Sequence, residues 1–165
     1  MKAFLIAGFF FLSFVNISAQ ECNCCTPHQQ AFDFWLGKWT VYDTAGQEVG
    51  KNTIIKLENG CILTEHWKGA SGSNGSSYNY FDRKDSTWNQ LWVDNQGNNL
   101  KLKGKSDKPG RMTLRSELKL NKNRRYYDKI TWTKVSKNEV IQLWVTYRED
   151  DSKIAEIFKG IYRKE

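Results

Sequence analysis

A glutamate or glutamine stands two positions before a tryptophan at three places in this sequence. The pairs are Glu65 and Trp67, Gln90 and Trp92, and Gln142 and Trp144. Because side chains alternate between the two faces of a β-strand, each polar group shares a face with its tryptophan. A few carboxylate or amide groups among aromatic rings are typical of cavities that bind small molecules. The sequence therefore predicts a binding cavity if these faces turn inward.

The turns between the strands predict which residues face one another on neighbouring strands. Three facing pairs follow: Phe81 with Trp88, Asn79 with Gln90, and Trp132 with Gln142. The expected ligand-binding residues are Glu65, Trp67, Asn79, Trp88, Gln90, Trp92, Trp132, Gln142 and Trp144. Two alternatives stay open. In the first, these side chains pack on one another in a solid core. In the second, Ile141, Leu143 and Val145 point inward, which turns the amide and indole of that strand outward.

Candidate catalytic groups are few. Glu65 and Asp94 are the only plausible inward carboxylates, and a buried Glu beside indole rings could have a raised pKa and act as a general acid or base. The same carboxylate could equally be structural, accepting hydrogen bonds from Trp or Tyr. His28 lies before the first strand, and the alternation places His66 outside the barrel. No catalytic residue, metal site or cofactor is therefore assigned.

A basic segment contributes to the formal net charge of +7. Lys101, Lys103 and Lys105 alternate with Leu100 and Leu102, which is the pattern of a strand with one solvated face. The favoured interpretation is a solvated outer surface, so no nucleic-acid partner is expected. The alternative is an interaction module that holds an anionic polymer on this basic face.

The segments that carry these residues have the composition of β-strands. From Trp39 onward, stretches rich in Val, Ile, Thr, Tyr and Trp alternate with turns rich in Gly, Asn, Asp and Ser. Such short connections require antiparallel neighbours, and closure removes the two edges that an open sheet would expose. The predicted fold is all-β, an antiparallel up-and-down barrel of about ten strands, with a short helix at residues 29–36 across one end.

One predicted strand, over residues 112–120, alternates with particular clarity. Its apolar residues Met112, Leu114, Leu118 and Leu120 share one face. The other face carries Thr113, Arg115, Glu117 and Lys119.

The N-terminus has the three parts of a secretory signal peptide. Lys2 supplies a basic start, an apolar run spans Ala3 to Val15, and Ala19 is the small residue before the expected cut. The alternative, a membrane anchor, needs about 20 apolar residues, and this run is shorter. We expect an exported protein, periplasmic or secreted, with a signal peptide at 1–19, a tail at 20–30 and one barrel domain at 31–165. No membrane association is expected after cleavage, and the oligomeric state stays open.

Four cysteines accompany this leader: Cys22, Cys24, Cys25 and Cys61. In an oxidising compartment they could form disulfides, and we favour one bond from the tail to Cys61. The alternative is a metal site formed by the first three cysteines with His28. The connectivity cannot be read from the sequence.

The segment Gly37-Lys38-Trp39 resembles the Gly-x-Trp signature of lipocalins and their calycin relatives. In those proteins the tryptophan closes one end of the barrel and an arginine from the last strand packs over it. The resemblance implies structural roles for Gly37 and Trp39, and for Arg163 as the matching arginine.

Longer stretches resemble a bacterial lipocalin-like family of unknown function. The matching segments are 33–39, Gly60-Cys61 with Glu65 and Trp67, 79–82, 88–94, 131–133 and 158–163. This resemblance covers residues 31–165 and implies the fold but no activity, and the leader with its early cysteines fits exported versions from flavobacterium-like organisms. The related nitrobindin-like barrels ligate haem through a histidine near the C-terminal end. No histidine follows His66, so haem binding is rejected.

Overall fold

The computed structural model describes residues 22–165. The predicted signal peptide and the first two residues of the predicted tail lie outside the described residues. Helical structure within residues 22–165 is limited to two three-residue 3-10 turns, η1 (Asp33–Trp35) and η2 (Glu58–Gly60). No helix in this part of the chain has the length and apolar character needed to cross a membrane.

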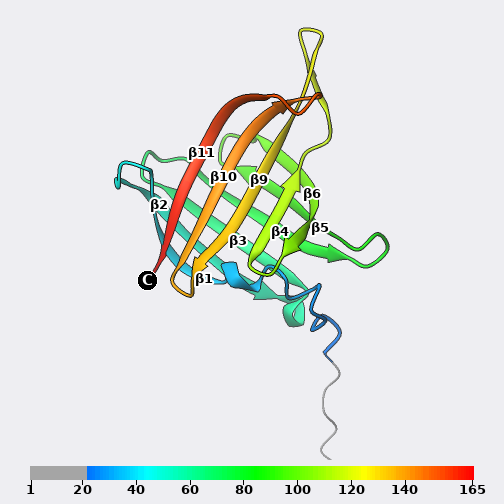
Figure 1. Ribbon diagram of the computed structural model, residues 1–165. Coiled ribbons are helices and arrows are strands. Elements are labelled where there is room, and N and C mark those ends of the chain that lie inside the picture. The colour runs from blue at the N-terminus through cyan, green and yellow to red at the C-terminus, as the bar shows by residue number, and fades with distance from the viewer. Residues whose placement is uncertain (1–21) are drawn as a thin grey trace, which may run out of the picture.

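Eleven β-strands account for most of the described chain (Figure 1). Their bounds are β1 (Gly37–Tyr42), β2 (Glu48–Leu57), β3 (Ile62–Gly69), β4 (Asn74–Asp82), β5 (Thr87–Asp94), β6 (Asn99–Lys108), β7 (Arg111–Arg115), β8 (Lys119–Asn121), β9 (Arg124–Ser136), β10 (Glu139–Arg148) and β11 (Lys153–Lys164). Strands β1 to β7 pair in sequence, β7 pairs with β9, and β9, β10 and β11 lead back to β1. The predicted closed, antiparallel barrel of ten strands is confirmed.

Strand β8 stands outside this ring because it pairs with β9 alone. Its hairpin with β9 projects beyond one end of the barrel, whereas the N-terminal segment runs across the opposite end (Figure 1). The register agrees with the three facing pairs expected from the turns, which are Phe81 with Trp88, Asn79 with Gln90, and Trp132 with Gln142.

Aromatic side chains fill the end of the barrel that the N-terminal segment covers. This aromatic base consists of Phe32, Trp35, Trp39, Trp88 and Trp132, each at most 2% exposed. Residues 29–36 were expected to form a short helix, but they form turns that end in η1. A 3-10 turn repeats every three residues, so Phe32 and Trp35 both point into the barrel, where their rings stack with centroids 5.0 Å apart.

Two disulfides fix the N-terminal segment. Cys24 bonds to Cys61, the residue before β3, and Cys22 bonds to Cys25. The expected link between the tail and Cys61 is confirmed. Since no cysteine in the described chain is free, the metal-binding alternative for this cluster loses its thiolate ligands.

The cation that covers Trp39 is Lys164, and the expectation that Arg163 does so is wrong. Lys164 lies opposite Trp39 in the pairing of β1 with β11, and its Nζ is 5.3 Å from the centre of the indole. Arg163 points to the outer face, with its guanidinium 4.9 Å from the centre of the Tyr42 ring. The reason is the alternation of side chains along β11, which puts adjacent residues on opposite faces.

The expected continuous strand over residues 112–120 is also wrong, because β7 ends at Arg115 and β8 begins at Lys119. The chain leaves regular pairing at Ser116, whose N–H donates to the carbonyl oxygen of Asp128 at 2.8 Å. Beyond this point Leu118 and Leu120 are exposed, although the apolar residues of β7 are buried. The break turns Lys119 toward the barrel interior.

Candidate functional site

A cavity of about 500 Å³ lies inside the barrel above the aromatic base. It extends to the end where the β3–β4 turn, the β5–β6 turn and Lys119 of β8 lie. Its volume is within the range of about 300–1,000 Å³ that is usual for small-molecule sites. The alternative of a solid core is therefore wrong for this half of the barrel.

Polar side chains from six barrel strands form a buried arc at the floor of the cavity, which we call the polar belt. Its members are Asn52 on β2, Glu65 on β3, Ser77 and Asn79 on β4, Gln90 on β5, Gln142 on β10 and Tyr162 on β11. Each is at most 9% exposed. Because buried polar groups are costly unless they are hydrogen-bonded, the belt depends on the bonds among its own members.

Most of these hydrogen bonds run in one direction, toward Glu65. Gln90 Nε2 donates to Asn79 Oδ1 at 2.8 Å, and Asn79 Nδ2 donates to Ser77 Oγ at 2.9 Å. Ser77 Oγ then donates to Glu65 Oε2, and from the other side Asn52 Nδ2 donates to Glu65 Oε1, both at 2.7 Å. The carboxyl group thus accepts at both oxygens, which is the pattern that an ionised carboxylate requires.

The far end of the polar belt joins Tyr162 to Gln142, whose Oε1 accepts a hydrogen bond from the phenol. Burial, together with the nearby Glu65 carboxylate, raises the pKa of Tyr162 well above its ordinary value, against a hydrogen bond with Asn52 that lowers it. The phenol is therefore neutral at physiological pH and acts as a hydrogen-bonding group.

Burial also raises the pKa of Glu65, to about 7, even though the hydrogen bonds from Asn52 and Ser77 lower it. No lysine or arginine within residues 22–165 forms an ion pair with this carboxyl group. Glu65 is thus a buried carboxyl group with hydrogen-bond donors but no counter-ion among residues 22–165, and its pKa is near neutral pH.

Aromatic side chains line the wall one step above the polar belt. They are Trp67, Trp92, Trp144 and Phe158. The three tryptophans each follow a belt residue by two positions, which puts them on the same inward face. The rings of Trp67 and Phe158 meet edge to face, with centroids 6.2 Å apart.

Three of these rings lie across glycines, which leaves the centre of the barrel open. A Cβ atom on the glycine would fall within 2.3–2.7 Å of the ring in each pair: Gly50 with Trp67, Gly75 with Trp92, and Gly160 with Phe158. Glycine in a strand is typical of places where another group must approach the backbone closely. Here the absent side chains give the rings room against the barrel wall.

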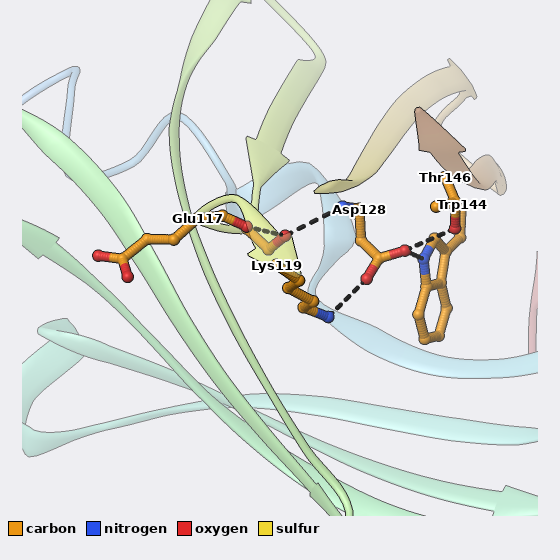
Figure 2. A network of polar contacts seen from close by, with 6 residues as sticks. Glu117, Lys119, Asp128, Trp144 and Thr146 are labelled. Carbon is orange, nitrogen blue, oxygen red and sulfur yellow. Dashed lines mark hydrogen bonds and ion pairs between the residues drawn. The ribbon is translucent and has the colours of Figure 1, made fainter. Parts of the chain in front are cut away.

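Asp128 organises one side of the open end (Figure 2). Its Oδ1 accepts hydrogen bonds from Trp144 Nε1 at 3.0 Å and Thr146 Oγ1 at 2.7 Å, and its Oδ2 lies 2.6 Å from Lys119 Nζ. Burial would raise the pKa of Asp128, but these three donors outweigh it and lower the pKa. Asp128 therefore stays ionised and fixes both the indole of Trp144 and the ammonium group of Lys119.

The structure brings most of the expected site residues together around the cavity. Those that line it are Glu65, Trp67, Gln90, Trp92, Trp132, Gln142 and Trp144. Asn79 is a buried member of the polar belt, behind Gln90. Trp88 belongs to the aromatic base instead, where its Nε1 donates to the carbonyl oxygen of His28 at 3.0 Å. The alternative that turns Gln142 and Trp144 outward is wrong.

Other expected groups lie away from the cavity floor. Asp94 is at the rim, where its carboxylate accepts hydrogen bonds from Asn98 and the backbone of its own turn, which lower its pKa. His66 is exposed, as its alternation predicted. Lys101, Lys103 and Lys105 are exposed on the outer face of β6, and Lys103 pairs with Asp85.

Sequence reasoning missed several members of the site. Asn52, Ser77, Tyr162, Lys119 and Asp128 were not among the expected residues. A signal existed for Asp128, which has the same alternation as Trp132 on β9. Asn52 and Ser77 carry no comparable signal, since their role depends on contact with Glu65 across neighbouring strands.

Comparisons with known proteins give no family assignment. No protein-family model matches the sequence, and no curated protein matches it significantly. The site must therefore be interpreted from its own geometry and chemistry.

Proposed function

We propose that this chain is an exported, lipocalin-like protein that binds a small, partly apolar molecule in its barrel cavity. The observation that carries the proposal is a cavity of about 500 Å³ with indole walls and a polar floor. Aromatic walls supply the apolar contact area, and a few fixed polar groups orient a ligand. Gln90 and Gln142, one at each end of the polar belt, are the amides placed to do so.

Three observations support export and the lipocalin-like assignment. Disulfides persist mainly in oxidising compartments, and this chain carries two. The first nineteen residues have the pattern of a signal peptide. Trp39 of the Gly-x-Trp segment lies in the closed end of the barrel, as the resemblance implies, although its covering cation is Lys164.

Native mass spectrometry of the protein purified from its own host tests the proposal directly. We expect an additional mass, that of a small molecule, on the folded chain, and its loss on mild denaturation. Titration of the stripped protein with the extracted compound should then change the tryptophan fluorescence. A protein that carries no compound and shows no response to any host extract would contradict the proposal.

A pair of neighbouring variants on β5 controls this experiment. Trp92 lines the cavity, whereas Leu91 points outward and is 38% exposed. We expect Trp92→Ala to weaken binding strongly and Leu91→Ala to leave it unchanged. Equal effects of both substitutions would argue against a ligand inside the barrel.

A second candidate function is an enzyme that uses Glu65 as a general acid or base. The observation that favours it is the burial of Glu65 at the cavity floor, which raises the pKa of its carboxyl group to about 7 and suits proton transfer at neutral pH. Asp94 loses its candidacy because its carboxylate is committed to a turn. Turnover of the bound compound by the wild type, lost in Glu65→Gln while binding is kept, would favour the enzyme.

A further inference from the structure

The Glu65 carboxyl group sits where a negative charge is expensive. It is 6% exposed, and its two oxygens accept hydrogen bonds from Asn52 and Ser77. These bonds satisfy part of its accepting capacity, since each carboxylate oxygen has two lone pairs. Buried charges in proteins are usually paired with an opposite charge, and none of the residues 22–165 supplies one here. In its ionised form Glu65 therefore has no counter-ion among residues 22–165, and a bound cation would supply one.

The direction of the belt's hydrogen bonds keeps Glu65 in the accepting role. Ser77 Oγ already accepts from Asn79, so its own proton is free to be donated to Glu65. Asn79 in turn has its carbonyl oxygen occupied by Gln90, which fixes the orientation of its amide. The surrounding groups are therefore arranged to receive an ionised carboxylate.

The other charged groups around the cavity do not neutralise Glu65. Lys119 is the cationic side chain that lines the cavity within residues 22–165, and its ammonium group is held by Asp128 at 2.6 Å. Asp94 adds a further carboxylate at the rim. Tyr162 is neutral because its pKa is raised. Counted together, the acidic groups exceed the basic ones, although the chain as a whole carries a formal charge of +7.

The aromatic walls above Glu65 also suit a positively charged ligand. Indole rings are the best partners for cations among aromatic side chains, and cages of aromatic rings bind ammonium groups. Trp67 follows Glu65 by two residues on the same face, and Trp92 and Trp144 line the same cavity. A cation in this cavity would have both a carboxylate and indole rings in its surroundings.

We propose that the cavity binds an organic cation, an amine with an apolar body, whose ammonium group pairs with the Glu65 carboxylate. The inference rests on the proposed function, because it names the class of ligand for the same cavity. The apolar body of the ligand lies between the rings of Trp92, Trp144 and Phe158, toward the open end.

Three probes with one skeleton and different charges test this inference: phenethylamine, 2-phenylethanol and phenylacetate. Isothermal titration of the full mature protein at pH 8 measures each affinity. We expect phenethylamine to bind at least about tenfold more tightly than 2-phenylethanol, since hydrogen bonds to charged groups contribute more than neutral ones. Phenylacetate should bind most weakly, because its carboxylate would face Glu65.

Two variants test which carboxylate causes the preference for the amine over the alcohol. In Glu65→Gln the advantage of the amine over the alcohol should fall to about twofold or less, while binding of 2-phenylethanol is retained, which also shows that the variant is folded. Asp94→Asn removes the other carboxylate that lines the cavity and should keep the wild-type preference.

The possible outcomes separate the two proposals. If the alcohol or the acid binds wild-type protein as tightly as the amine does, a ligand cavity exists but the inference of a cationic ligand is wrong. If the preference for the amine persists in Glu65→Gln, the assignment to this carboxylate is wrong. If none of the three probes binds and no host compound is found, both the inference and the proposed function fail.

Discussion

The contact between Gly75 and Trp92 permits a sharp test of how the cavity is kept open. Gly75 lies on β4 without a left-handed backbone, so alanine introduces no backbone strain there. Its Cβ would, however, lie 2.3 Å from Trp92 Cζ2 and 2.8 Å from the carbonyl oxygen of Val93. To reach an ordinary contact of about 3.5 Å, the indole must move by roughly 1 Å, and the cavity that Trp92 lines offers the space for this movement.

The magnitude follows from the cost of overpacking. Additional methylene groups in well-packed regions destabilise proteins by about 1–3 kcal/mol, so we expect Gly75→Ala to lower the free energy of unfolding by about 2 kcal/mol. Trp92→Ala removes the clash with the ring but leaves the contact with the Val93 carbonyl oxygen. The double variant should therefore be more stable than the sum of the single effects predicts, by about 1 kcal/mol.

Urea unfolding followed by circular dichroism measures this coupling without relying on tryptophan fluorescence. The wild type, the two single variants and the double variant should also be titrated with a ligand of the cavity, because a displaced indole would reduce the volume available to that ligand. Additive free energies, within about 0.5 kcal/mol, would refute the reasoning that the Trp92 ring lies across Gly75.

Three further predictions concern stability. As the pH rises from about 4.5 to about 7, Glu65 ionises in the unfolded chain before it does so in the folded protein. This residue should therefore lower the free energy of unfolding by roughly 3 kcal/mol over that interval. Urea unfolding at several pH values measures this effect, and Glu65→Gln should abolish the part of the pH dependence that Glu65 contributes. Asp128→Asn should cost about 1–3 kcal/mol by the same assay, since it weakens three hydrogen bonds, and an unchanged midpoint would contradict the role assigned to Asp128. Replacing Cys24 and Cys61 by alanine opens a loop with a sequence separation of 37 and should lower the free energy of unfolding by about 4 kcal/mol. Removal of the disulfide between Cys22 and Cys25 should cost less, because it closes a much shorter loop. Equal losses of stability in the two variants would contradict this reasoning.

The barrel itself could be predicted because its signals are local. Turn residues and alternation specify strand boundaries, and turn lengths specify the register that pairs Asn79 with Gln90 and Trp132 with Gln142. The same period of two placed Glu65 and Trp67 on one face, and the burial of Glu65 shows that this face turns inward. These features need no knowledge of distant contacts.

The errors arose where a distant contact overrides local alternation. Ser116 interrupts the strand after β7 because its backbone and hydroxyl bond to Asp128, which lies twelve residues later. Lys119 consequently faces the cavity, although a continuous strand would place it outside. The assignment of Arg163 to Trp39 failed for a simpler reason, since the resemblance suggested a residue type and the structure supplies its neighbour Lys164.

The stacked rings of the aromatic base determine from which end a small molecule could reach the barrel cavity. Phe32 and Trp35 are fully buried, and the disulfide from Cys24 to Cys61 holds the segment that carries them. One end of the barrel is therefore closed by side chains, and a ligand bound in the cavity would enter and leave through the other end. If the proposed ligand binding holds, this geometry would suit storage or carriage of a small molecule and not its passage from one end of the barrel to the other.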